Sequence, residues 1–283
     1  MTTALCETLG IEQPFIGAPI SAAPAFAAAV SNAGGLGMIQ ATWLEPDELR
    51  ACIAEVRRLT DRPFGVNFVI PLIAGEGQAK LDAALEAAVP VVSTFWGDPA
   101  PMIGRIHSAG ALAFHTIGTA AEARQAVDSG VDAVVAQGAE AGGHVCGEIG
   151  TMALVPAVAD AVPGTHVIAA GGIADGRGLA AALALGAGAA WVGTRLLLAR
   201  EHHSHPIYRE RLKTAAETES VRTNLFDGGW SDAPLRCLRN ETLAAWQRAG
   251  CPPPGQRPNE GDVVARDASG RAILRYSIEA VSY

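Results

Sequence analysis

A chain of 283 residues that is 49% hydrophobic and 18% charged can bury a sizeable core without disulfides or metal ions. Its net charge of −8 argues against a nucleic acid or an anionic membrane surface as the main partner. The five cysteines are scattered and form no Cys-x-x-Cys pair, which argues against a disulfide framework or a zinc site. The chain also shows no pattern of a signal peptide or a membrane span, so we expect a cytoplasmic protein.

Short apolar runs rich in Val and Ile recur along the chain, and most precede an Ala-rich helical pattern. The eight runs are PFIGAP, GLGMIQ, FGVNFV, VPVVST, ALAFHT, DAVVAQ, HVIAAGG and AAWVGT. The helical patterns cover residues 24–32, 46–59, 78–88, 99–109, 120–129, 154–161 and 177–185. Strand-plus-helix units in series, with strands apolar on both faces, predict an α/β fold: a closed (β/α)₈ or TIM barrel. A doubly wound sheet is the alternative, but no G-x-G-x-x-G follows the first run.

The repeating pattern ends near residue 201, which divides the chain into two parts. We expect residues 1–200 to form the barrel and residues 201–283 to form a C-terminal extension of helices and irregular segments. The segment HHSHPIYRERLKTAAET and residues 241–249 have helical patterns, and the Pro/Gly-rich CPPPGQRPNEGD follows them. We expect this extension to pack on the barrel rather than to form an independent domain.

Glycines follow the seventh and eighth strands, at the loops where TIM barrels favour phosphate groups. Gly171 and Gly172 stand in AAGGIADGRG, and Gly193 and Thr194 stand in WVGTRLLL. Their backbone N–H groups, with the Thr194 hydroxyl, precede helix N-termini that favour anions. These loops predict a phosphate site; ordinary turn glycines are the alternative.

Polar groups at other strand ends are expected at the same face. Ala18, Pro19 and Ile20 form a turn after the first strand, whose backbone could hydrogen-bond a flat ring. Asn67 lies inside an apolar strand, where an amide is costly unless it is bonded, so it either supports a loop or contacts a ligand. Gln137 ends the sixth strand. Convergence of these groups predicts a ligand site at the carboxyl ends of the strands.

Two histidines are candidates for chemistry. His144 follows Gly142 and Gly143 in VVAQGAEAGGHVCGEIG, where bare backbone allows a ligand to approach and the imidazole can act as a base. A simple turn is the alternative. His115 ends the fifth strand and is either a substrate contact or a structural histidine. The histidines of EHHSH lack acidic partners at metal spacing, so we expect no metal site.

Several stretches together resemble the nitronate monooxygenase family, formerly called 2-nitropropane dioxygenases. The likeness runs from about residue 14 to residue 208 and is carried by PFIGAPISAAPAFAAAVSNAGGLGMI, FGVNFVIP, AQGAEAGGHVCGEIG, VIAAGGIADGRGLAAALALGAGAAWVGTR and HPIYRERL. The resemblance implies a (β/α)₈ barrel that binds FMN non-covalently, with His144 as the catalytic histidine. It places the FMN contacts at Ala18, Pro19, Ile20, Asn67, Gln137, Gly142, Gly172, Trp191, Val192, Gly193 and Thr194.

The activity that the resemblance implies is oxidation of nitronates or nitroalkanes with O2 to carbonyl compounds and nitrite. The partners would then be a small-molecule substrate and O2, and a homo-oligomer is compatible with the sequence. Flavin-dependent enoyl-acyl-carrier-protein reductases have nearly the same motifs, so an NAD(P)H-dependent enoyl-thioester reductase is the first alternative. The second is a barrel that binds FMN without redox turnover, in a specialised pathway.

Overall fold

The computed structural model describes residues 2–73, 75, 77–226, 230, 233–266 and 270–277. The chain divides into two compact units. The first, here called the barrel unit, comprises residues 1–141 and 146–203. The second, here called the C-terminal unit, comprises residues 142–145 and 204–283.

The barrel unit is built on eight parallel strands in the order β1-β9-β8-β6-β5-β4-β3-β2. A parallel bridge between Ile16 and Leu36 joins the first and last strands of this order and closes the barrel. The strands are β1 (Phe15–Gly17), β2 (Gly37–Gln40), β3 (Phe64–Val69), β4 (Val91–Phe95), β5 (Leu112–Ile117), β6 (Ala133–Gln137), β8 (His166–Ala170) and β9 (Ala189–Val192). The predicted (β/α)₈ barrel is therefore confirmed.

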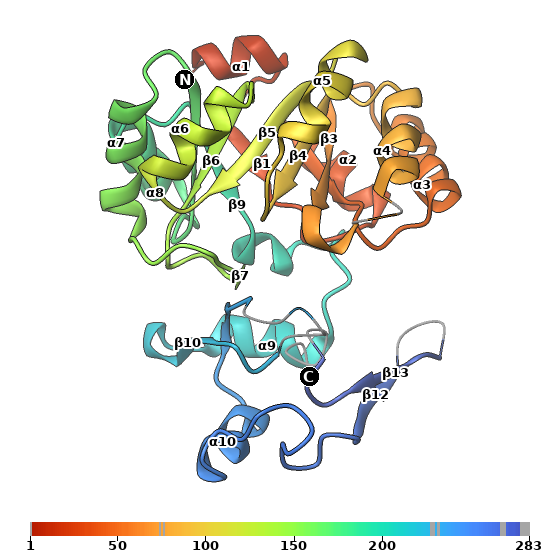
Figure 1. The fold of residues 1–283 in the computed structure, drawn as a ribbon, viewed down its shortest axis with the longest axis vertical. Helices are drawn as coiled ribbons and strands as arrows, with labels where there is room; N and C mark the ends of the chain where they lie inside the picture. Colours follow the sequence, from red (N-terminus) through yellow and green to blue (C-terminus); the bar gives the residue numbers. More distant parts are fainter. Residues whose placement is uncertain are drawn as a thin grey trace. The chain divides into compact units, whose positions relative to one another are not determined.

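Helices lie around the outside of this sheet (Figure 1). They are α2 (Pro24–Asn32), α3 (Pro46–Leu59), α4 (Gly77–Glu86), α5 (Ala100–Ser108), α6 (Ala120–Asp128), α7 (Thr151–Ala161) and α8 (Gly176–Ala184), with short 3₁₀ helices η1 (Ile70–Leu72) and η2 (Thr194–Leu198). Local signals explain several starts: α2 and α3 begin with proline at the first position, where its missing N–H costs nothing. The predicted bounds of α2 and α3 match those observed.

The barrel unit has two apolar layers. Side chains facing the barrel interior, such as Ile16, Met38 and Phe114, form one cluster, and the other lies between the strands and the helices. A helix that the sequence analysis did not predict, α1 (Ala4–Leu9), places Leu5 and Leu9 in the interior cluster. The Thr3 hydroxyl donates to the Gly188 carbonyl oxygen at 2.7 Å, which fixes the start of α1 beside the start of β9.

The C-terminal unit has its own small core. Strand β11 (Leu235–Leu238) is the central strand of a small sheet and pairs antiparallel with β10 (Ser220–Thr223) on one side and with β7 (Gly143–His144) on the other. Strand β12 (Val263–Arg266) pairs antiparallel with β13 (Ala272–Leu274). Helices α9 (Pro206–Thr214) and α10 (Glu241–Arg248) lie within the two helical patterns, and η3 (Glu217–Glu219) precedes β10. Phe226, Leu235 and Leu243 are among its buried core residues.

The boundary between the units falls between residues 203 and 204, close to the predicted division at 201. Residues 142–145 belong to the second unit, which was not predicted from the sequence. Packing of the extension on the barrel stays a prediction. Among the residues that the structure describes, no helix combines the length and apolarity that crossing a membrane requires.

Candidate active site

Asn67 lies in the barrel interior, level with polar residues of the two neighbouring strands. Asn67 of β3 is in register with Gln40 of β2 and Ser93 of β4, and its side chain is 2% exposed. Within the described part of the chain, the Asn67 amide forms no side-chain hydrogen bond. A buried amide without a partner is costly, so Asn67 is a polar group that a ligand can satisfy.

The turn after β1 is held by its neighbours. The Ala18 N–H donates to the Val192 carbonyl oxygen at 2.8 Å. The Gln40 amide donates from Nε2 to the Pro19 carbonyl oxygen at 3.4 Å, and its Oε1 accepts from the Thr42 hydroxyl at 2.6 Å. Gln40 was not among the predicted site residues, although it is a polar residue that ends an apolar strand, as Gln137 is. Gln40 therefore fixes the Ala18-Pro19-Ile20 turn.

On another part of the barrel, Gln137, Ala170 and Trp191 share one register level across β6, β8 and β9. Trp191 also pairs with Ile16 of β1 and is 8% exposed. Its indole belongs to the interior cluster, so this residue helps to fill the barrel. Val192, Gly193 and Thr194 then lead out of β9 into the exposed start of η2.

The loop after β8 depends on its two glycines. Gly171 and Gly172 have φ of +110° and +68°, in the left-handed region where a Cβ is strained. A Cβ on Gly171 would also lie 2.9 Å from the Thr151 hydroxyl oxygen. That hydroxyl lies 3.0 Å from both the Gly171 carbonyl oxygen and Glu140 Oε2, which also accepts from the Thr151 N–H at 2.9 Å. Glu140 and Thr151 thus hold the glycine loop in shape.

Backbone N–H groups are available at both predicted phosphate loops. Those of Gly172 and Ile173 donate no hydrogen bond to any residue that the structure describes. Those of Thr194 and Arg195 begin η2, which has no side-chain cap. The Arg195 side chain, which the sequence analysis missed, is exposed and forms no ion pair with the described residues. Its position directly after Gly193 and Thr194 was the sequence signal that could have identified Arg195 as part of the phosphate site.

The N-terminus of α8 differs from the sequence-based expectation. Its first N–H groups are already capped, because the Asp175 carboxylate accepts from the Arg177 and Gly178 N–H groups at 2.9 and 3.3 Å. Hydrogen bonds from the Arg177 guanidinium and these N–H groups lower the pKa of Asp175 to about 2. An anion would therefore meet the N–H groups of the glycine loop and of η2 rather than those of α8.

His144 belongs to the C-terminal unit, as Gly142 does. It is paired with Leu235 of β11, and its Nδ1 donates to the Ala233 carbonyl oxygen at 3.1 Å. The imidazole lies 4.3 Å from the Trp230 ring, measured between centroids. Burial lowers the pKa of His144 below its ordinary 6.5, against the opposing effect of the Ala233 and Pro234 backbone carbonyls. The imidazole is therefore neutral at pH 7 and carries its proton on Nδ1.

His115 lies on the outer side of the barrel. Ala113 and Ile117, two residues away on either side, belong to the cluster beneath the helices, whereas Phe114 belongs to the interior cluster. His115 Nδ1 lies 2.8 Å from the Thr94 hydroxyl oxygen. The structure thus separates His115 from the strand-end residues, and we do not include it in the proposed substrate site.

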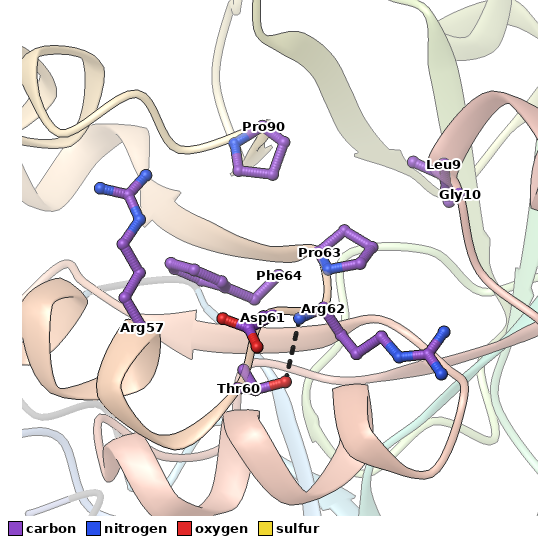
Figure 2. A pocket seen from close by; sticks show the side chains of 9 residues that line it. All are labelled: Leu9, Gly10, Arg57, Thr60, Asp61, Arg62, Pro63, Phe64 and Pro90. Atoms are coloured by element: carbon purple, nitrogen blue, oxygen red, sulfur yellow. Dashed lines mark hydrogen bonds between the residues drawn. The ribbon is translucent and has the colours of Figure 1, made fainter.

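A hollow of about 510 Å³ lies at the opposite, amino-terminal end of the strands (Figure 2). The Arg62 N–H donates to the Thr60 hydroxyl oxygen at 3.1 Å, and the Arg62 guanidinium pairs with Glu12 at 2.6 Å. The Arg57 guanidinium carbon lies 6.0 Å from the centre of the Phe64 ring. Because TIM-barrel chemistry is found at the carboxyl end, this hollow is not part of the candidate site.

The nitronate monooxygenase family matches residues 2–79 and 72–256. The chain belongs to this family. The nitronate monooxygenase of Pseudomonas aeruginosa is 37% identical over 300 residues, which cover 89% of this chain and 84% of the relative. A relative from Mycobacterium tuberculosis, the (3aS,4S,5R,7aS)-5-hydroxy-7a-methyl-1-oxo-octahydro-1H-indene-4-carboxyl-CoA dehydrogenase, is 39% identical over 247 residues, with coverages of 86% and 68%.

Solved structures agree with this membership. FabK from Thermotoga maritima has a TM-score of 0.81 at 39% identity, covering 88% of this chain and 78% of that one. The nitroalkane oxidase from Streptomyces ansochromogenes has a TM-score of 0.77 at 34% identity, covering 86% and 81%. The chain is therefore an enzyme, a flavin-dependent oxidoreductase of the nitronate monooxygenase family.

Proposed function

We propose that the chain is an FMN-dependent nitronate monooxygenase. It would oxidise nitronates, and nitroalkanes with an acidic α-carbon, with O2 to carbonyl compounds and nitrite. The observation that carries the proposal is the set of available N–H groups at Gly172, Ile173 and the start of η2, where a phosphate can accept them. Their loops follow β8 and β9, the seventh and eighth strands of the barrel.

The residues of the barrel unit fit FMN at both ends of that cofactor. The N–H groups, the Thr194 hydroxyl and the Arg195 guanidinium suit a phosphate monoester, whose charge they would balance. The Asn67 amide, which is buried and forms no side-chain hydrogen bond with the residues that the structure describes, suits the polar edge of the flavin ring. The Ala18-Pro19-Ile20 turn, fixed by Gln40, offers backbone groups to the same ring. When bound, the flavin supplies the electron transfer that no side chain can perform.

We assign the role of general base to His144. Since Nδ1 donates to the Ala233 carbonyl oxygen, Nε2 carries the lone pair of the neutral imidazole. The lowered pKa keeps that nitrogen unprotonated at pH 7. Nε2 would accept the α-proton of a neutral nitroalkane, which leaves the nitronate anion with the electron pair of the broken C–H bond. A substrate that arrives as a nitronate needs no such step.

A second candidate function is an oxidoreductase acting on a thioester. The relatives named as carboxyl-CoA dehydrogenases, at 39% and 40% identity, are at least as similar to the chain as the Pseudomonas aeruginosa enzyme. In this case NAD(P)H or an acyl-CoA, rather than a nitronate, would exchange electrons with the flavin.

An absorbance experiment on the purified holoenzyme separates these functions. The flavin is released by denaturation and identified by chromatography, and the holoenzyme is then mixed anaerobically with propyl-2-nitronate, NADPH or an acyl-CoA in separate samples. Bleaching by the nitronate, followed by nitrite production in air, supports the proposal. Bleaching by NADPH or the acyl-CoA alone favours the thioester function, and a protein that binds no flavin rejects both.

A further inference from the structure

A cavity of about 570 Å³ lies within the barrel unit, outside the candidate active site. It is lined by the loop between β4 and α5, by His115, Thr116 and Ile117 of β5, by residues along the length of α6 and by Cys146. Its volume is within the range of sites that hold small molecules. Neither the family match nor the proposed function assigns a role to it.

The imidazole of His115 has one nitrogen available in this cavity. The Thr94 hydroxyl donates to the Phe114 carbonyl oxygen at 3.1 Å, so toward His115 Nδ1, at 2.8 Å, it acts as the acceptor. Nδ1 therefore carries the proton and Nε2 the lone pair. His115 is 6% exposed, and Nε2 accepts no hydrogen bond from the described residues. Burial lowers the pKa of His115 to about 4, despite the opposing effect of Asp98, so Nε2 remains an acceptor at neutral pH.

The cavity is also negatively charged. Its lining includes the carboxylates of Asp98 and Glu122 but no lysine or arginine. Each carboxylate is fixed by a backbone N–H: Asp98 Oδ1 accepts from Ala100 at 3.0 Å, and Glu122 Oε2 accepts from Gly118 at 2.7 Å. Both retain a second oxygen for a ligand. The indole of Trp96 adds an aromatic surface, which attracts a cation.

We propose that this cavity is a second binding site, which takes a small organic cation with N–H donors, such as an amidinium. The cation would donate to His115 Nε2, pair with Asp98 and Glu122, and lie against Trp96. No group of three or more His, Cys, Asp and Glu side chains among the described residues is arranged to hold a metal ion. None of the cavity's lining residues is among those that we assign to the flavin or to the general base.

The test uses benzamidine as the probe and benzoate, its anionic counterpart of similar shape, as the control ligand. Calorimetry on the holoenzyme is expected to give a benzamidine Kd below about 1 mM and no binding of benzoate. H115F and D98N are each expected to weaken benzamidine binding at least about tenfold. H107F, which replaces an exposed histidine of α5, is the matched control and should bind as the wild type does.

Asp98 is exposed, so D98N tests the proposal even where H115F fails to fold. Cys146 gives a second readout. In a C251S background, which removes the exposed cysteine, benzamidine is expected to slow alkylation of Cys146 by iodoacetamide, followed by peptide mass spectrometry. Equal binding of benzamidine and benzoate, wild-type affinity in D98N, or unchanged alkylation of Cys146 would each overturn the proposal.

Discussion

The Nδ1 atom of His144 donates to the carbonyl oxygen of Ala233, 3.1 Å away and 89 residues later in the chain. A carbonyl can only accept, so this contact selects the tautomer with the lone pair on Nε2. The contact lies within the C-terminal unit.

Replacing His144 tests that role. H144N should retain flavin and oxidise a nitronate at a rate near that of the wild type, but lose at least about 100-fold in kcat/KM with the neutral nitroalkane. H107N is the control and should leave both activities unchanged. Oxygen consumption with 2-nitropropane and with its nitronate measures the two rates, and full retention of nitroalkane activity would exclude His144 as the base.

The same residue predicts a pH dependence. The basic form of His144 is the neutral one, and its pKa lies below the ordinary 6.5. The kcat/KM for nitroalkane should therefore fall as the pH drops through that lowered pKa, below 6.5. The kcat/KM for the nitronate should not fall in this pH range, because that substrate needs no base. The same fall of kcat/KM with both substrates would contradict the role of His144 as the base.

Replacing Asn67 tests whether its amide binds the flavin or supports the protein structure. Its amide has no protein partner within the described residues, so N67L should leave the apoprotein as stable as the wild type, or more stable by about 1 kcal/mol. Flavin affinity should fall at least about tenfold, measured by fluorescence titration of the apoprotein. A large loss of apoprotein stability in N67L would instead indicate a structural amide.

Gly171 tests the glycine loop. G171A places a Cβ at φ of +110° and 2.9 Å from the Thr151 hydroxyl oxygen, so it should destabilise the protein by about 1–3 kcal/mol and weaken flavin binding. G176A is the matched control, because a Cβ at Gly176 meets no atom within 4 Å and alanine favours a helix. Urea denaturation with flavin titration measures both effects. Equal behaviour of the two variants would show that the loop tolerates a side chain.

His115 makes the stability of the protein depend on pH. The pKa of His115 is about 4 in the folded protein and near 6.5 in the unfolded chain, so between these values the unfolded chain binds the extra proton. The free energy of unfolding is therefore highest above pH 6.5. It falls by up to roughly 3 kcal/mol as the pH drops toward 4, because the unfolded chain gains a proton that the folded protein does not bind. The free energy of unfolding of H115F minus that of the wild type should therefore be larger at pH 4.5 than at pH 7. Urea denaturation at both pH values measures this difference.

The sequence by itself determined the barrel. Each strand is a short apolar run that ends in glycine or polar residues, and α2 and α3 carry proline at their first position, so local signals place these elements. The glycines of the phosphate loops were also visible locally, because a conformation with positive φ favours glycine. Short elements such as α1 and β7 were not predicted, because they contain too few residues to show a hydrophobic periodicity.

Only the tertiary structure decided which way His115 faces and where His144 belongs. A parallel strand is buried on both faces, so its sequence has no alternation of polar and apolar residues to distinguish the interior from the helix side. His115 consequently looked like a strand-end ligand, although it faces the outer cavity. His144 pairs with β11 through hydrogen bonds between backbones about 90 residues apart in the chain, and such a contact leaves no signal in the residues around it.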